Sequence, residues 1–132
     1  MTMADVSSLA EELTESWQEG GGDAENWVLI LDGLGEFLNS DADYALQDLL
    51  KTCRSNGVFV IADGETSDVQ GSWPILQAIK ASRYGIVLQP DQMDGDSLFK
   101  TQFARMNRAE FPEGRGMFVR NGKAIRVQVA LL

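Results

Sequence analysis

The sequence predicts a single α/β domain, in which a mainly parallel sheet is flanked by helices and ends in an antiparallel hairpin. Three short apolar runs, at residues 27–31, 58–62 and 84–88, alternate with segments of helical periodicity. This alternation is typical of strands joined by crossover helices in a parallel sheet. Near the C-terminus Asn121-Gly122 separates two strand-like runs, and an Asn-Gly pair is the strongest short signal for a hairpin turn. A length of 132 residues corresponds to one domain.

The first helix is expected over residues 5–18, where apolar side chains recur at helical spacing. A capping box at Ser8–Glu11 would stabilise its first turn. The glycines at 20–22 would end the helix and begin a short linker that reaches Asn26.

The next two strands are expected at Trp27–Leu31 and Val58–Ala62. Both runs are continuously apolar, and strands that read this way are buried on both faces by helices. We therefore expect helices on both sides of the sheet.

The remaining elements follow from shorter signals. Residues 33–38 resemble a turn with a short helical segment. Asp41 or Asp43 would cap a second helix that ends at Gly57. Pro74 would lie in the first turn of a third helix, and residues 97–106 carry a weaker helical pattern. The apolar stripe of the second helix would consist of Tyr44, Ala45, Leu46, Leu49, Leu50 and Cys53.

The composition excludes several classes of function. The net charge is −9, with fourteen acids and two bases in residues 1–66 (−12) and six acids and nine bases in residues 67–132 (+3). The acidic half would repel a phosphate backbone. One cysteine and no histidine rule out Cys/His zinc sites and histidine-dependent nucleophiles. No apolar run approaches a membrane span, and no signal peptide is recognisable, so we expect a soluble, cytoplasmic chain.

Two aspartates are candidate site residues, because each directly follows an apolar strand. Asp32 and Asp63 would lie at the carboxyl ends of the strands, where open α/β sheets bind ligands. An alternative of about equal weight is that such an aspartate accepts hydrogen bonds in its own turn. The sequence contains no G-x-x-x-x-G-K-[ST] loop, so the chain alone is not expected to hydrolyse ATP. No G-x-G-x-x-G motif follows a strand, which disfavours a Rossmann-like enzyme.

Two other charged segments have simpler explanations. The loop Asp91–Asp96 holds three acids but lacks the EF-hand ligand pattern, so a solvated turn is favoured over a calcium site. The arginines after residue 104 are expected mainly to form salt bridges with the acidic half, and the alternative is an arginine that reaches a phosphate on a neighbouring subunit. The tryptophans are expected to pack in the core or at its edge.

The order of these segments resembles a known family. The sequence W-V-L-I-L-D-G-L at 27–34, R-S-N-G-V-F-V-I-A at 54–62 and F-P-E-G-R-G-M-F-V-R-N-G-K-A-I-R-V-Q-V-A at 111–130 is similar to the C-terminal half of an FtsK/SpoIIIE-type ATPase domain. The degenerate repeats of EccC-like type VII secretion ATPases are the nearest variety. The resemblance covers about residues 5–130 and is most specific from Pro112 to Ala130.

The resemblance implies a RecA-like fold of the P-loop NTPase type, in an ATPase that forms rings or chains. Asp32 would correspond to the Walker B aspartate that holds Mg²⁺ and ATP. Asp63 and Thr66 would lie where the family places a polar sensor. Arg83 and Arg115 match family arginines that contact a phosphate or a neighbouring subunit. The resemblance identifies no catalytic residue with confidence.

Three departures shape the functional hypothesis. The phosphate-loop half is missing, Asp32 is followed by Gly33 instead of a second acid, and the sensor region reads Asp-Gly-Glu-Thr. We therefore expect a partial or degenerate module of an ATP-driven translocase for DNA or secreted proteins, inactive as an isolated chain. ATP and Mg²⁺ would bind only in an intact domain. The alternative is a non-catalytic binding module that docks a substrate peptide or a partner ATPase domain.

The expected partners follow from the same hypothesis. They are sister ATPase domains or copies of this chain, with DNA or a secreted protein engaged through a parent assembly. No direct membrane contact is expected, although the parent protein could be membrane-associated. A missing strand leaves sheet edges exposed, and exposed edges favour self-association.

Overall fold

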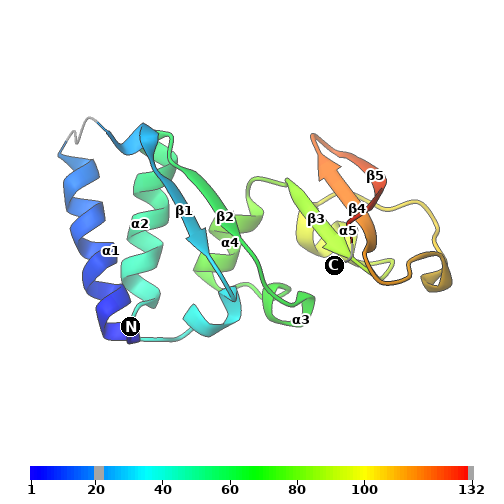
Figure 1. Cartoon of the computed structure of the whole chain (residues 1–132), viewed down its shortest axis with the longest axis horizontal. Helices are drawn as coiled ribbons and strands as arrows, with labels where there is room; N and C mark the ends of the chain where they lie inside the picture. The colour runs from blue at the N-terminus through cyan, green and yellow to red at the C-terminus, as the bar shows by residue number, and fades with distance from the viewer. Residues whose placement is uncertain (20–22, 131–132) are drawn as a thin grey trace. The chain divides into compact units, whose positions relative to one another are not determined.

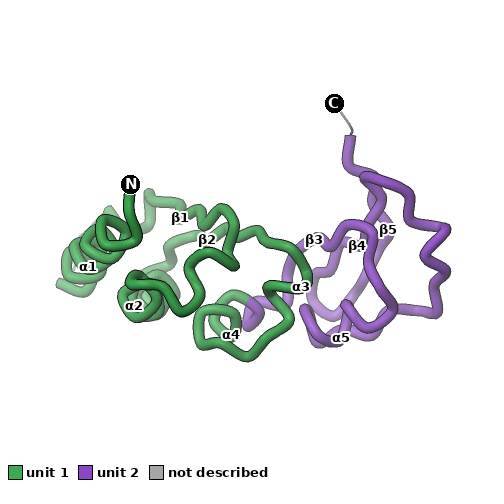
Figure 2. The backbone as a smooth tube through the Cα atoms, turned by 90° about the horizontal axis from the view of Figure 1, so that it is seen from below, with its two compact units in different colours: residues 1–79 green, residues 80–132 purple. Residues whose placement is uncertain are grey.

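The computed structural model of the chain describes residues 1–19 and 23–130. It divides into two compact units, Met1–Ile79 and Lys80–Leu132 (Figure 2). Unit 1 contains, in chain order, α1 (Met3–Gln18), η1 (Ala24–Asn26), β1 (Val28–Leu31), η2 (Leu34–Phe37), α2 (Asp43–Asn56), β2 (Phe59–Ala62), α3 (Thr66–Val69) and α4 (Pro74–Lys80, whose last residue belongs to unit 2) (Figure 1). Unit 2 contains β3 (Gly85–Leu88), α5 (Asp94–Phe99), η3 (Arg108–Glu110), β4 (Arg115–Arg120) and β5 (Lys123–Gln128).

The core of unit 1 lies between its helices and one face of a two-stranded parallel sheet. β1 and β2 pair in parallel from Val28↔Phe59 to Leu31↔Ala62. Among the described residues neither strand has a second neighbour, so each has one free edge. In Figure 2, α2 and α4 lie on the same side of β1 and β2. The fully buried side chains of this core include Leu34, Leu49, Ile75, Leu76 and Cys53.

The other face of this sheet is uncovered, which contradicts the expectation of strands buried on both faces. Val28, Ile30, Phe59 and Ile61 are 51, 66, 61 and 46% exposed. The continuous apolar runs were misleading because they give the same pattern whether or not anything covers the second face. We call these four apolar residues the acidic face, because the aspartates Asp32 and Asp63 follow its two strands.

The first helix begins earlier than expected, and its capping box is a different one. Thr2 is the N-cap: its hydroxyl accepts from the Asp5 N–H, and the Asp5 carboxylate accepts from the Thr2 N–H at 2.7 Å. The box expected at Ser8–Glu11 was wrong, because these residues lie inside α1. The expected linker glycines, 20–22, lie outside the described residues, and residues 24–26 form η1.

The second helix agrees with expectation at its end and differs at its start. Gly57 ends α2 in the left-handed conformation, with φ +72°. Asp43 begins α2, is buried, and accepts from the Asn39 N–H and the Gln47 side chain, whereas the N-cap residue is Ala42. Tyr44, expected in the apolar stripe, is 83% exposed, since the buried stripe runs through the other residues expected for it.

Unit 2 is built on an antiparallel sheet in the order β3-β4-β5. The hairpin at Asn121-Gly122 is confirmed, with φ values of +52° and +75° that suit a tight turn. The expectation that β3 joins a mainly parallel sheet was wrong. β3 pairs antiparallel with β4, from Gly85↔Val119 to Leu88↔Gly116.

The helix expected at 97–106 is instead α5, at Asp94–Phe99. Lys100 ends it at φ +51°, and the following residues cover the helix closely. A Cβ on Gly95 would lie 2.3 Å from the Thr101 carbonyl oxygen, so only glycine fits there. Phe99, Phe103 and Val119 are buried in unit 2. In the described ranges 1–19 and 23–130, no helix has the length and apolar character needed to cross a membrane.

Candidate functional site

The carboxyl ends of β1 and β2 bring the two candidate aspartates into neighbouring loops. Leu31 and Ala62 are register partners, and Asp32 and Asp63 are the residues that follow them. Both aspartates are exposed. Two carboxylates therefore follow neighbouring strands, at the edge of the sheet where open α/β folds bind ligands.

The Asp63 carboxylate organises the loop that follows β1. Its Oδ1 accepts from the Gly33 N–H at 2.6 Å, and its backbone carbonyl accepts from the Leu34 N–H at 2.7 Å. Gly33 has φ +70°, a conformation that favours glycine. The Asp63 carboxylate thus binds a backbone amide of the neighbouring loop, after β1, rather than one of its own turn.

The Asp32 carboxylate differs, since it forms no hydrogen bond or ion pair within the part of the chain that the structure describes. It is exposed and lies directly after the last residue of β1. A carboxylate without an internal partner keeps its oxygens available for a ligand. Oxygen donors of this kind suit Mg²⁺, and one or two carboxylates plus phosphate oxygens commonly hold it.

Thr66 lies just beyond this edge, as the first residue of α3. α3, which was not expected from the sequence, is a single turn whose Asp68 lies close to η2. A Cβ on Gly35 would lie 2.8 Å from the Asp68 Oδ2 atom, so glycine permits this approach. The run Thr66-Ser67-Asp68, with small polar residues suited to a first helical turn, was the available signal.

Unit 1, which contains this edge, is strongly negative as a whole. Counting unit 1 by residue type gives fifteen acids and two bases, Lys51 and Arg54, a balance of −13. Both bases lie on α2, which packs on the covered face of the sheet. A unit with this charge attracts cations. Among the described residues, no cluster of three or more His, Cys, Asp or Glu could hold a metal ion unaided.

The two candidate arginines belong to unit 2 and differ in their engagement. Arg115 is half-buried: its Nη1 donates to the Glu110 carbonyl at 3.3 Å, and its Nε donates to Gln128 at 3.4 Å. It therefore fastens η3 to the β4–β5 hairpin. Arg83 is exposed, with φ +53°, immediately before β3.

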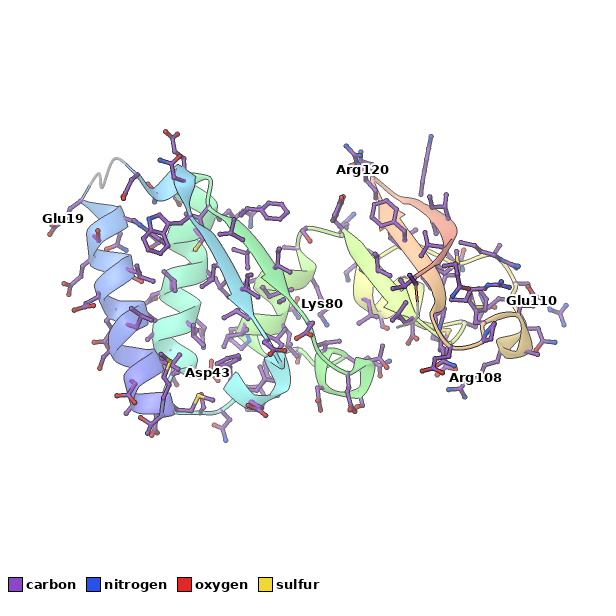
Figure 3. The ribbon with its side chains drawn as sticks, in the orientation of Figure 1. Glu19, Asp43, Lys80, Arg108, Glu110 and Arg120 are labelled. Atoms are coloured by element: carbon purple, nitrogen blue, oxygen red, sulfur yellow. The ribbon has the colours of Figure 1, made fainter. Side chains whose placement is uncertain are left out.

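Two further arginines of unit 2, Arg108 and Arg126, form ion pairs inside that unit. Arg108 pairs with Asp91 at 3.5 Å, and Arg126 pairs with Glu110 while its guanidinium lies 5.3 Å from the Phe111 ring centroid. The salt bridges expected between these arginines and the acidic half of the chain stay a prediction. Figure 3 shows Arg120 at the turn end of β4, and Arg108 and Glu110 on the η3 loop.

The acidic loop 91–96 is accounted for by the fold. The Asp94 carboxylate is buried and accepts from the Asp91 N–H at 2.8 Å, at the start of α5. Asp91 is the partner of Arg108. The loop thus begins α5, and Asp94 is buried where a solvated turn was expected.

Comparison with known proteins supports the fold alone. No protein-family profile and no curated protein matches the chain. Among solved structures, the cytoplasmic domain of EssC is similar, with a TM-score of 0.59, 18% identity and 96% of this chain covered. The chain spans 26% of that structure's length. The chain therefore shares the fold of part of the EssC cytoplasmic domain.

Proposed function

We propose that the chain is a module of an ATP-driven secretion translocase of the FtsK/SpoIIIE type, and that it contributes one edge of a nucleotide site that a partner completes. The main support is the EssC-like fold over nearly the whole chain, since EssC is a type VII secretion ATPase of this family. The quoted sequence motifs resemble the same family. A RecA-like arrangement is part of this proposal.

The site residues have separate roles in this proposal. Asp32, whose carboxylate has no partner among the described residues, would hold Mg²⁺ on the phosphates of ATP. Asp63 holds the loop that presents Asp32, through its bond to Gly33. Thr66 and Arg83 would contact nucleotide or a neighbouring domain. Arg115, already bound to Glu110 and Gln128, would act by holding η3 against the β4–β5 hairpin.

Protein is the favoured cargo under this proposal, and DNA the less favoured one. The chain carries −9 overall and unit 1 carries −13. A DNA-tracking surface needs clustered Lys and Arg to displace counterions from the phosphates. Secretion of a protein has no such requirement.

The test measures nucleotide binding and hydrolysis. A fluorescent ATP analogue with Mg²⁺ should show no saturable binding to the isolated chain. Adding the chain to a phosphate-loop ATPase domain from the same organism's secretion system should raise ATP hydrolysis. In that mixture Asp32→Asn should lower the stimulated rate on the order of tenfold or more, because a metal-bound phosphate loses several kcal/mol of stabilisation without its metal.

Glu36→Gln is the matched control, since Glu36 is another exposed acid of the same loop region. It should leave the stimulated rate unchanged. Saturable Mg–ATP binding by the isolated chain would overturn the assignment of inactivity. Equal rates for Asp32→Asn and the unmodified chain would overturn the role of Asp32.

A second candidate function is a non-catalytic binding module, and the uncovered apolar face of β1 and β2 favours it. Large exposed apolar patches mark interaction sites. This function predicts that a partner ATPase domain or a secreted substrate binds the chain without any change in hydrolysis. Binding that persists in Asp32→Asn, with no stimulation by the unmodified chain, would support it over the first proposal.

A further inference from the structure

Each unit exposes an apolar sheet face, and the two faces are built in the same way. On the acidic face, the register pairs Val28 with Phe59 and Ile30 with Ile61 across two strands. In unit 2, the register aligns Ile86 with Phe118 and Phe118 with Ile125 across three strands. Ile86 and Ile125 are 53 and 57% exposed, and Leu88 is 48% exposed.

The face in unit 2 is bordered by basic residues. Arg120 and Lys123 are register partners. Arg120 lies two residues from Phe118, and Lys123 lies two residues from Ile125, so both share that side of the sheet. Both are exposed. Tyr84 borders the face from the other strand, with its ring edge-on to Phe118 at 5.4 Å. We call Ile86, Leu88, Phe118, Ile125, Arg120 and Lys123 the basic face.

Acids follow both strands of the acidic face and precede one of them, β1. Asp32 and Asp63 follow β1 and β2, and Asp23 and Glu25 precede β1. All four are exposed. By contrast, Lys51 and Arg54 lie on α2, which packs against the covered side. The charges divide accordingly: unit 1 carries −13, and unit 2, with five acids and nine bases, carries +4, which sum to −9.

We infer that the acidic face of one copy binds the basic face of a second copy, so that the chain associates head to tail. Apolar side chains would be removed from water on both partners, and the opposite charges around them would select this pairing. Contact between two acidic faces would set like charges against each other, which is unfavourable. An interface between two different surfaces generates rings or filaments rather than closed dimers.

The inference goes beyond the proposed function, because it requires neither nucleotide nor a partner ATPase. The test is the mass of the chain in solution, measured by sedimentation velocity over a concentration series without ATP. The unmodified chain should associate more as its concentration rises. Ile30→Asp, on the acidic face, and Ile86→Lys, on the basic face, should each be monomeric, since each adds the charge its own face already carries.

Mixing the two variants gives the sharpest result. Ile30→Asp keeps a working basic face and Ile86→Lys keeps a working acidic face, so an equimolar mixture should form a one-to-one heterodimer and nothing larger. Tyr44→Asp is the matched control, because Tyr44 is exposed on α2, outside both faces. It should associate like the unmodified chain. Circular dichroism and tryptophan fluorescence confirm that each variant is folded.

Four outcomes would overturn the inference. The unmodified chain could stay monomeric throughout the series, or both variants could associate as it does. The mixture could remain monomeric, or Ile30→Asp could abolish association while Ile86→Lys leaves it intact, which indicates contact between identical faces. Any of these results leaves the nucleotide experiment unaffected.

Discussion

At the scale of residues, two aspartates in equivalent positions have different roles. The Asp63 carboxylate binds the Gly33 N–H, whereas the exposed Asp32 has no such bond among the described residues. Asp63→Ala should therefore lower the free energy of unfolding by about 1 kcal/mol, the usual value for one hydrogen bond. Asp32→Ala should change it by less than about 0.5 kcal/mol. Urea denaturation of both variants checks this, and equal losses would contradict it.

The single cysteine gives a second prediction at this scale. Cys53 is fully buried in unit 1, and burial raises the pKa of its thiol from 9.0 to about 11. At pH 8 this raised pKa lowers the thiolate fraction of Cys53 about a hundredfold. Thiolate is the reactive form of cysteine. A disulfide reagent that releases a coloured thiol should react very slowly until urea unfolds the protein. Prompt reaction of the native chain would contradict the burial.

The raised pKa of Cys53 also makes the free energy of unfolding depend on pH. The folded state keeps the Cys53 proton to higher pH than the unfolded chain does, so its contribution is full below pH 9 and declines as pH rises towards about 11. Cys53→Ala should lose this part of the alkaline dependence, measured as the midpoint of thermal unfolding against pH.

At the scale of elements, the start of α1 separates two possible capping boxes. Two hydrogen bonds lower the pKa of Asp5 below its ordinary 3.8: the bond from the Thr2 N–H has the larger effect, and the bond from the Thr2 hydroxyl the smaller one. This contribution is present above pH 3.8 and is lost as pH falls through the lowered pKa. In Thr2→Ala the Asp5 pKa should rise, as followed by NMR titration, and the helix should be less stable at neutral pH.

Ser8→Ala is the control for that prediction, since Ser8 was the cap expected from sequence and lies within α1. Alanine is the best helix former, so this variant should be as stable as the unmodified chain or slightly more so. A larger loss from Ser8→Ala than from Thr2→Ala would restore the other capping box.

Elements were predictable from sequence where one local signal sufficed. The hairpin at Asn121-Gly122, the end of α2 at Gly57 and the helix at Pro74 depend on backbone preferences of a few residues. The partner of β3 and the bare side of β1 and β2 depend on what lies beside a strand. Hydrophobicity alone does not encode a neighbour, so both were predicted wrongly.

At the scale of the whole molecule, tryptophan gives a selective report of unit 1. Trp17, Trp27 and Trp73 all belong to residues 1–79. Gly95→Ala in unit 2 would place a Cβ 2.3 Å from the Thr101 carbonyl and 2.6 Å from the Phe103 ring, and such overpacking costs about 1–3 kcal/mol. The denaturation midpoint by circular dichroism should fall while the tryptophan midpoint stays unchanged.

Gly71→Ala is the control, because the nearest atom to its Cβ would be at an ordinary 3.4 Å. It should leave both midpoints in place. Equal shifts of the two signals in Gly95→Ala would show that the units unfold as one.

The candidate site was predictable in part for a related reason. Asp32 and Asp63 could be identified from the ends of apolar runs, because parallel neighbours place their carboxyl ends on one edge. That the Asp63 carboxylate would bind the loop after β1 could not be predicted, since this bond depends on the left-handed turn at Gly33. α3 and the bonds that engage Arg115 also depend on tertiary packing.

The free edges of β1 and β2 give Asp32 and Asp63 one more role. Short, uncharged, β-branched and aromatic segments such as residues 27–31 and 58–62 are the kind that stack into cross-β fibrils. Asp32 and Asp63 stand as gatekeepers at their ends, where repulsion between stacked carboxylates opposes fibril growth. Loss of both carboxylates by substitution would remove this protection.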